Sequence, residues 1–238
     1  MLTNNVVAIS IIASLLVLHV PAMAERVLIF GGTRNTGLET VRLLLEQGDS
    51  VAAFVRDSSD VGALNELNVP LIFGDALAVD TVDSAFAVEE FDSVVSTLSG
   101  SIRNHAVDSQ GNINVFAAAE RASVKRLVLV TVIGASGTEG VLEEKARQFL
   151  KPVIDAKTVA ESDLRKRNLN WTILRPGQLA KGAATGNGVL TEDQTVMGRI
   201  TMGELAALVI ECLGDKRTIG KIFHVVDREM IGSFSFFD

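Results

Sequence analysis

The sequence contains no tyrosine, so no tyrosine hydroxyl is available anywhere in the 238 residues as a proton donor. Its single cysteine, Cys212, excludes an intrachain disulfide, a Cys–Cys metal site and paired redox chemistry. Cys212 lies in an apolar helical pattern, which predicts a role in core packing. The three histidines are too scattered to suggest a metal cluster, and we expect no metal site.

An excess of positive charge is also lacking. The formal net charge is -7, and no cluster of Lys and Arg is dense enough to form a basic groove, so nucleic acid is not an expected partner. With 47% hydrophobic and 21% charged residues, the composition is that of a globular protein. About 210 residues remain after the N-terminal leader described next, enough for one domain with a full core and too few for two.

Residues 1–24 contain no Lys, Arg, Asp or Glu. An apolar run of about 15 residues ends before Ala22-Met23-Ala24, which resembles a signal peptidase site, whereas a membrane span needs about 20 residues. We expect a cleaved signal peptide and a periplasmic or secreted protein. Because the leader has no positive start, an uncleaved membrane anchor and a buried helix stay open, and a non-functional leader would leave the protein cytoplasmic. Residues 25–238 form the expected domain.

Short apolar runs alternate with amphipathic stretches from Arg26 onward. This alternation predicts βαβ units and an α/β fold with a doubly wound, mostly parallel Rossmann sheet. The expected strands are 27–30, 51–55, 70–73, 93–96, 127–131, 171–174 and 222–226. The Gly- and Thr-rich segment of about 178–200 lacks clear periodicity and precedes a helix that opens near Thr201, so we expect it to form a small C-terminal substrate lobe.

The first strand runs directly into the turn Gly31-Gly32-Thr33-Arg34-Asn35-Thr36-Gly37, and a helix is expected over 38–46. Glycine in such a turn lets backbone N–H groups approach a pyrophosphate, and the positive end of the helix dipole favours its charge. The order of strand, turn and helix therefore predicts a dinucleotide site.

This turn resembles that of the short-chain dehydrogenase/reductases, T-G-x-x-x-G-x-G, with Gly31 and Gly37 as the outer glycines. Asn35 replaces the middle glycine, and asparagine tolerates left-handed backbone angles better than most residues. The resemblance extends over Arg26 to Asp227 and is similar to the atypical, NmrA-like or flavin-reductase-like branch. The features that carry it are Val55-Arg56-Asp57, Gly74-Asp75, the run 108–114, Lys125 to Thr131, Ala156-Lys157 and the run 172–177.

A NADP cofactor is favoured over NAD because the second strand ends in Arg56, where NAD-specific proteins have an acidic residue. Arg34 resembles a second family position that contacts the 2′-phosphate, and guanidinium groups match phosphate geometry. The resemblance also implies that Asp75 and Ala76 flank the adenine and that Lys157 holds the nicotinamide ribose. The full set of expected cofactor residues is Gly31, Thr33, Arg34, Asn35, Thr36, Gly37, Arg56, Asp75, Ala76, Ser96, Thr97, Leu98 and Lys157.

The typical catalytic pair of this superfamily is Tyr-x-x-x-Lys, and here Val153 occupies the tyrosine position before Lys157. Valine cannot donate a proton, which excludes the usual mechanism. The family serine falls near Thr131, with Ser136 as a looser alternative. His105 lies beside the end of the fourth strand and is a possible proton donor, although a helix cap or a solvent-facing ring is the alternative. The candidate catalytic residues are therefore Lys157, Thr131 and His105.

Two functions follow from this pattern. The first is an NADPH-dependent oxidoreductase that passes hydride to a small-molecule acceptor, such as a quinone, a flavin or another conjugated system, which needs no tyrosine acid. The second is a non-catalytic NADP-binding regulator or assembly factor. No Gly-x-Ser-x-Gly elbow supports a hydrolase.

Overall fold

The structure is a computed structural model that describes residues 24–101 and 103–232. The predicted leader falls outside these residues except for Ala24, so its cleavage or anchoring stays a prediction. Within the described part, no helix combines the length and the apolar character that a bilayer span requires.

Eight strands form one sheet in the order β3-β2-β1-β4-β5-β6-β10-β8, and β7 and β9 form a separate pair. The strands of the large sheet are parallel except β8, which is antiparallel to β10. This is the predicted mostly parallel Rossmann sheet. The strand bounds are β1 Arg26–Phe30, β2 Ser50–Val55, β3 Leu71–Phe73, β4 Ser93–Ser96, β5 Arg126–Val130, β6 Trp171–Pro176, β7 Gln178–Ala180, β8 Gly188–Thr191, β9 Arg199–Thr201 and β10 Lys221–Asp227.

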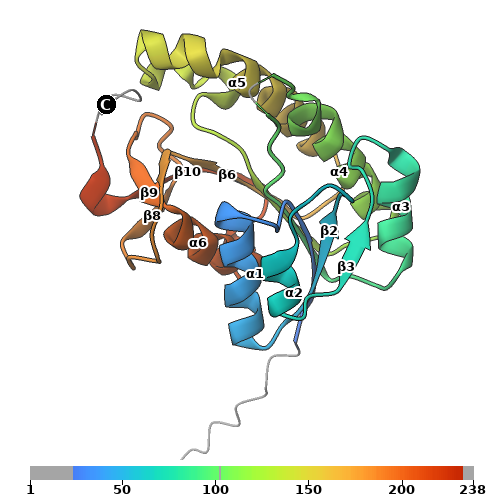
Figure 1. Cartoon of the computed structure of the whole chain (residues 1–238). Helices are drawn as coiled ribbons and strands as arrows, with labels where there is room; N and C mark the ends of the chain where they lie inside the picture. Colours follow the sequence, from blue (N-terminus) through green and yellow to red (C-terminus); the bar gives the residue numbers. More distant parts are fainter. Residues whose placement is uncertain (1–23, 102, 233–238) are drawn as a thin grey trace, which may run out of the picture.

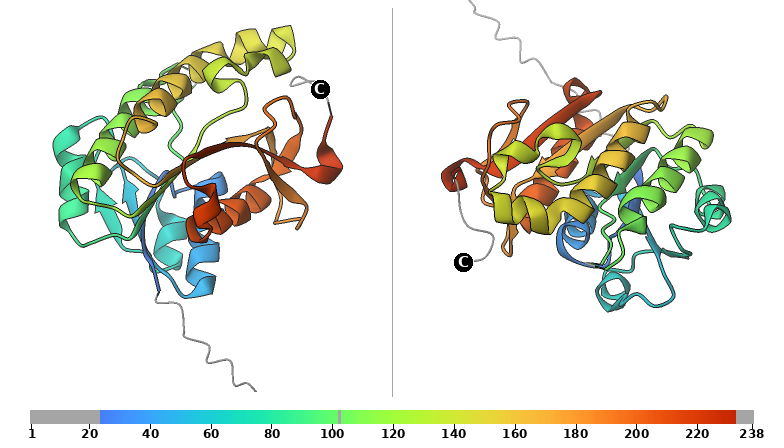
Figure 2. Two further views of the ribbon diagram at one scale, coloured as in Figure 1. Left: turned by 180° about the vertical axis from the view of Figure 1, so that it is seen from behind. Right: turned by 90° about the horizontal axis from the view of Figure 1, so that it is seen from above.

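Helices cover both faces of the sheet (Figures 1 and 2). One apolar core lies under α1 and α6, which pack together, and the other lies under α3, α4 and α5. Both cores are built from alternate residues of the same strands, such as Leu28 on one face of β1 and Ile29 on the other. The helix bounds are α1 Asn35–Gln47, α2 Gly62–Glu66, α3 Val79–Ala87, α4 Asn112–Arg121, α5 Glu144–Leu164 and α6 Met202–Gly214.

The strand order reverses between β1 and β4, because β1 is followed to one side by β2 and β3 while the chain returns to β4 on the other side. In open parallel sheets, ligands bind at such a switch point, outside the carboxyl ends of the strands. The turn 31–37 follows β1 at this point, and the loop after β4 lies beside it.

The segment of 178–200 differs from the aperiodic stretch expected from sequence. It supplies β7 and β8, and β8 extends the large sheet by pairing Gly188–Thr191 with the end of β10. Four backbone pairings hold β8 in place, although its sequence has too short an apolar run to indicate a strand. The helix after it opens at the predicted place, with the Thr201 hydroxyl accepting from the Glu204 N–H as an N-cap.

Candidate functional site

The turn after β1 is tightly folded against the start of the β4–α4 loop. Gly31 has φ 89°, and a Cβ atom on Gly37 would lie 2.2 Å from the Gly31 carbonyl oxygen. The Thr97 hydroxyl donates to that same carbonyl at 3.1 Å. Asn35 has φ 52°, which confirms that asparagine adopts the left-handed angle that the usual glycine would take. α1 begins at Asn35, three residues earlier than predicted.

The N-terminal end of α1 carries unused hydrogen-bonding capacity. Its N-cap residue, Arg34, makes no side-chain capping bond, and no acidic residue lies in the first turn. The buried Thr36 hydroxyl has no partner among the described residues. An anion at this helix end would accept from the free backbone N–H groups and from Thr36. The residues present therefore fit the pyrophosphate of a dinucleotide.

Replacing Gly37 by alanine should disrupt this turn. At an open helical position, alanine stabilises by about 1 kcal/mol relative to glycine. At Gly37, the added methyl group would overlap the Gly31 carbonyl, so we expect a lower melting temperature and weaker NADPH binding. Gly214→Ala is the matched control, because a Cβ atom there meets nothing within 4 Å. Thermal unfolding and calorimetry would measure both; equal behaviour of the two variants would contradict the close packing described here.

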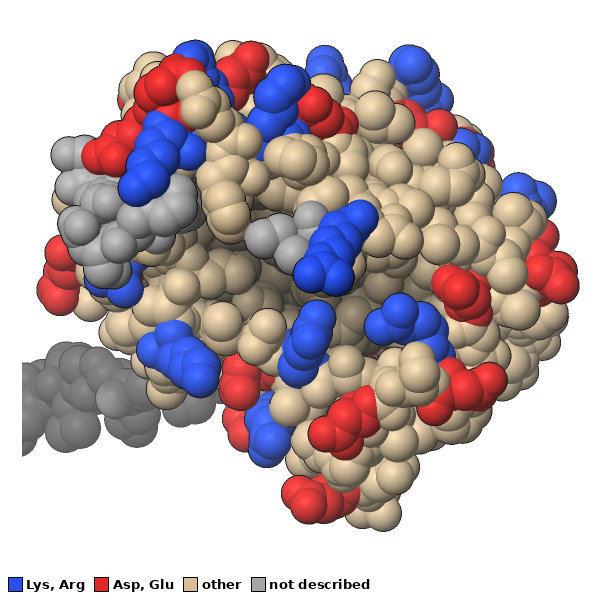
Figure 3. All heavy atoms as spheres, turned by 45° about the horizontal axis from the view of Figure 1, so that its top comes forward, with Lys and Arg blue, Asp and Glu red and all other residues tan. Residues whose placement is uncertain are grey.

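Arg34 and Arg56 are both exposed and stand after the carboxyl ends of adjacent strands, β1 and β2. Neither has an ion-pair partner within residues 24–101 and 103–232. Figure 3 shows this edge of the molecule, where Lys and Arg side chains border a hollow despite the negative net charge. The local charge therefore suits an anionic cofactor.

The other predicted cofactor residues occupy different environments. Asp75 is exposed and accepts from the Leu77 N–H, while Ala76 is buried and its carbonyl accepts from the Asn114 amide. Ser96 is buried, and its hydroxyl donates to Asn112 at 2.6 Å, so it supports α4 from inside. Thr33, Thr97 and Leu98 are partly exposed at the carboxyl edge.

Lys157 is only 3% exposed and lies on the inner face of α5. Its ammonium group donates to the Leu98 carbonyl oxygen at 2.5 Å and forms an ion pair with Asp108 at 3.2 Å. Asp108 Oδ1 has no hydrogen-bond partner among the described residues, so its contact with Lys157 is an ion pair. Burial lowers the pKa of the Lys157 ammonium, and the charge of Asp108 opposes that shift.

His105 is joined to Lys157 through Asp108. The His105 ring nitrogen Nδ1 lies 3.0 Å from Asp108 Oδ2, and the Gly100 N–H donates to the same oxygen at 2.9 Å. Asp108 is fully buried. It was missed as a site residue from sequence, although its position three residues after His105 could have indicated the contact.

Thr131 lies in a second buried cluster. Its hydroxyl donates to Glu161 at 2.7 Å, and the Ser136 hydroxyl donates to the other oxygen of that carboxylate at 2.6 Å. Arg175 is 1% exposed and forms a two-point ion pair with Glu161, at 3.0 and 2.5 Å. Gln194, from the predicted lobe, accepts from Arg175 at 3.0 Å. The two predicted hydroxyl candidates thus meet at one carboxylate.

The structure therefore brings Lys157 and His105 together and places Thr131 in a separate network. Glu161 lies four residues after Lys157, one turn along α5, and was not singled out from sequence. Val153, one turn before Lys157, is half-buried on the same helix. Within the described residues, no group of three or more His, Cys, Asp or Glu side chains could hold a metal ion.

Cys212 and His224 are buried side chains with a structural role. Burial raises the pKa of the Cys212 thiol to about 12, which keeps it inert, as expected for core packing. His224 is fully buried, and its Nδ1–H donates to the Val196 carbonyl at 2.9 Å. Burial lowers the pKa of the His224 ring, which favours its neutral form.

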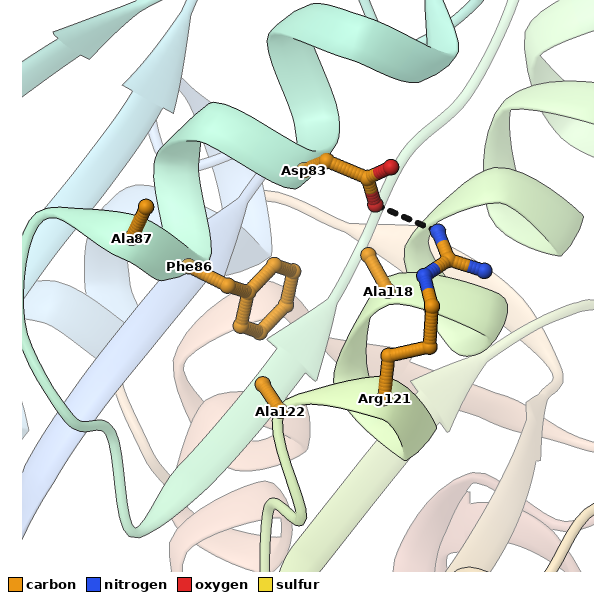
Figure 4. Close-up of a pocket in the computed structure, with 6 residues that line it drawn as sticks. All are labelled: Asp83, Phe86, Ala87, Ala118, Arg121 and Ala122. Carbon is orange, nitrogen blue, oxygen red and sulfur yellow. Dashed lines mark hydrogen bonds and ion pairs between the residues drawn. The ribbon is translucent and has the colours of Figure 1, made fainter.

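A pocket also lies between α3 and α4 (Figure 4). Its lining comes from the C-terminal halves of both helices, with the Asp83–Arg121 ion pair at its rim and Phe86 in its wall. In a parallel sheet, these helix ends lie at the edge opposite the carboxyl ends of the strands. The pocket is therefore separate from the predicted dinucleotide site.

Residues 31–216, from the glycine turn to just beyond α6, match the NAD(P)H-binding family. The chain belongs to this family. The match includes the turn, Lys157 and the buried clusters, and it agrees with the resemblance to the atypical short-chain dehydrogenase/reductases.

Solved structures of the family share the fold over most of the chain. ChuY, an anaerobilin reductase from Escherichia coli O157:H7, is 28% identical, with a TM-score of 0.78 over 87% of this chain and 100% of ChuY. The oxidoreductase ylbE from Lactococcus lactis is 25% identical, with a TM-score of 0.74 over 85% of this chain and 90% of ylbE. In family and fold, the chain is thus an NAD(P)H-binding protein whose structural neighbours include a reductase and an oxidoreductase.

A different kind of relative is the photosystem II assembly factor Ycf39 from Synechocystis. It is 27% identical over 161 residues, which are 66% of this chain and 46% of Ycf39. The chain thus spans about half the length of that relative.

Proposed function

We propose that this chain is an NADPH-dependent oxidoreductase that passes hydride to a conjugated acceptor, such as a quinone, a flavin or a bilin. The observation that carries the proposal is a buried Lys157–Asp108 pair at the carboxyl edge, combined with valine in place of the usual tyrosine acid. A conjugated acceptor spreads the negative charge that arrives with the hydride. It can therefore be protonated without an acid at position 153.

The proposed roles follow from position. The N-terminal end of α1 and Thr36 bind the pyrophosphate, and Lys157 orients the nicotinamide ribose from the inner face of α5. When bound, NADPH supplies the hydride. Val153 presents an apolar surface one turn away, and the Gln194 side chain links the lobe to the buried Arg175–Glu161 pair. Positioning of the acceptor against the cofactor accounts for most of the expected rate gain.

The similarity to an anaerobilin reductase supports the acceptor class. A bilin is a linear conjugated tetrapyrrole, so a reductase of this fold can act on an extended conjugated system. The identity of 28% over nearly the whole chain supports a shared class of acceptor and leaves the individual molecule to experiment.

NADPH should bind more tightly than NADH because Arg34 and Arg56 are exposed, and have no ion-pair partner in the described part of the chain, where a 2′-phosphate would lie. We expect Arg56→Ala or Arg34→Ala to weaken NADPH binding about tenfold and to leave NADH binding nearly unchanged, since a charge-assisted bond at a partly wet site contributes about 1.4 kcal/mol. Calorimetry would measure both cofactors. Arg165→Ala, an exposed arginine at the C-terminal end of α5, is the control. Equal affinities of the natural chain for the two cofactors would refute the assignment.

The alternative function is a non-catalytic NADP-binding assembly factor or regulator, and the similarity to Ycf39 favours it. An acceptor screen separates the two. Purified protein would be mixed with NADPH and with a quinone, a free flavin or a bilin, and loss of the reduced cofactor would be followed. Oxidation with at least one acceptor supports the enzyme, whereas tight NADPH binding without oxidation by any acceptor supports the regulator.

A further inference from the structure

Asp108 holds three groups at once. One carboxylate oxygen faces the Lys157 ammonium at 3.2 Å, and the other accepts from the Gly100 N–H at 2.9 Å and from His105 Nδ1 at 3.0 Å. A counterion for a buried lysine needs only the first of these contacts. The second oxygen instead accepts from the His105 ring and from the Gly100 N–H of the same β4–α4 loop.

The backbone around Asp108 is built to present this carboxylate. Residues Val107–Gly111 form a π-helical turn before α4, a rare conformation that is frequent at functional sites. The Asn112 amide donates to the Val107 and Asp108 carbonyls, at 3.3 and 3.0 Å, and so stabilises the turn from inside. A Cβ atom on Gly100 would lie 2.7 Å from the Asp108 carboxylate, so only glycine permits this approach.

These contacts determine which His105 nitrogen faces outward. A carboxylate accepts hydrogen bonds, so Nδ1 carries the proton that lies on Asp108. Nε2 is then the free nitrogen, and it has no partner among the described residues. The His105 side chain is 20% exposed, which leaves this nitrogen within reach of a bound molecule at the carboxyl edge.

We propose that Asp108 is a positioning residue that makes His105 the proton donor of the reaction; this inference rests on the proposed function. A bound NADPH would supply a hydride, with its electron pair, to form a C–H or N–H bond on the acceptor, and would itself be left as NADP⁺. The displaced electron pair moves to the far end of the conjugated system, which takes the proton from Nε2 of the His105 imidazolium, the form in which Nε2 carries a second proton while Nδ1–H stays on Asp108. The ring then returns to its neutral form, with Nδ1–H still on Asp108, and regains a proton from water.

This donor suits a conjugated acceptor in particular. In an isolated ketone, the oxygen that needs the proton is one bond from the carbon that receives the hydride. The family tyrosine position is on α5, whereas His105 is on the β4–α4 loop, with Asp108 between it and Lys157. His105 is therefore a proton donor at a different place from the family tyrosine. It suits an acceptor whose negative charge appears several bonds away from the atom that receives the hydride.

The first part of the proposal, that Asp108 keeps the proton of the neutral His105 ring on Nδ1, can be tested on the protein without cofactor. Long-range ¹⁵N–¹H NMR of protein labelled with ¹⁵N-histidine reports which ring nitrogen carries the proton when the ring is neutral. The chain has three histidines, and His105→Gln assigns the His105 signals. We expect the Nδ1–H form in the natural chain and a shift toward Nε2–H in Asp108→Asn, because the amide can donate to Nδ1. An Nε2–H form in the natural chain would overturn the proposal.

The second part, that His105 donates the proton, is tested by measuring the turnover of variants on the acceptor that the natural chain reduces fastest. We expect kcat to fall at least about tenfold in His105→Gln, with unchanged NADPH affinity by calorimetry, since loss of a positioned acid that water replaces in part lowers the rate. Asp108→Asn should lower kcat to the same level, and the double variant should lose no more. Asp155→Asn, a surface carboxylate on α5, is the control.

The outcomes separate the two claims. If Asp108→Asn is too unstable to purify, His105→Gln alone tests the donor role. The His105 side chain is partly exposed, so its replacement should disturb the fold less than a change at the buried Asp108. Turnover that is unchanged in His105→Gln would refute the donor role and leave the proposed function intact. Absence of turnover by the natural chain with every acceptor would refute both.

Discussion

Replacing Val153 by tyrosine should give the protein a ketone reductase activity, which we do not expect of the natural chain. The substitution restores the Tyr-x-x-x-Lys spacing, with the phenol one helical turn from the Lys157 ammonium. A ketone that receives hydride develops charge on an oxygen next to the reacting carbon, and a positioned acid there contributes about 10²- to 10⁴-fold in rate. We therefore expect a gain of that order for aliphatic ketones, and little change for conjugated acceptors.

The measurement is NADPH oxidation with a set of aliphatic ketones and aldehydes, by the natural chain and by Val153→Tyr. Val159→Tyr is the control, because Val159 is 52% exposed on the outer side of the same helix. Fast ketone reduction by the natural chain would show that an acid other than a tyrosine serves the carbonyl oxygen. No gain in Val153→Tyr would show that position 153 does not face the reacting oxygen.

The buried Glu161 should contribute more to stability than any surface carboxylate of the chain. Its two oxygens accept from Arg175, Thr131 and Ser136, and both members of the ion pair are almost fully buried. Removing one partner of such a pair leaves an uncompensated charge, which costs about 3–5 kcal/mol. Glu161→Gln should therefore lower the free energy of unfolding by about that amount.

Urea denaturation of the natural chain and of Glu161→Gln would measure this difference. The control, Glu144→Gln, changes an exposed glutamate in the first turn of α5 and should alter stability by about 0.5 kcal/mol or less. The double variant Glu161→Met with Arg175→Met should recover much of the loss, since no buried charge is left unpaired. A single variant as stable as the control would mean that water reaches Arg175.

The sheet was predictable because its signal is local. Each of the seven expected strands is an apolar run bounded by polar or Gly-containing turns, and all seven are present with ends that differ from the expected ones by at most two residues. The three short strands β7, β8 and β9 have no such run. They are held by pairing with β10 and with each other, which depends on the finished fold.

The same distinction applies to the site. The glycine turn could be recognised because its residues are consecutive, and even the left-handed angle of Asn35 followed from its side chain. Lys157, His105 and Thr131 were identified one at a time, whereas their partners Asp108 and Glu161 were not. These carboxylates are brought to them by the π-helical turn and by the buried face of α5, and neither arrangement leaves a contiguous motif.

The central claim, hydride transfer from NADPH by this chain, is tested most directly by a single turnover under anaerobic conditions. The protein would be loaded with one equivalent of NADPH and mixed with a quinone, a flavin or a bilin, while the absorbance of the reduced cofactor and of the acceptor is recorded together. We expect that, with at least one acceptor, one acceptor molecule is reduced for each NADPH oxidised, and that this is faster than in a mixture without protein. Bound NADPH that stays reduced in the presence of every acceptor would contradict it.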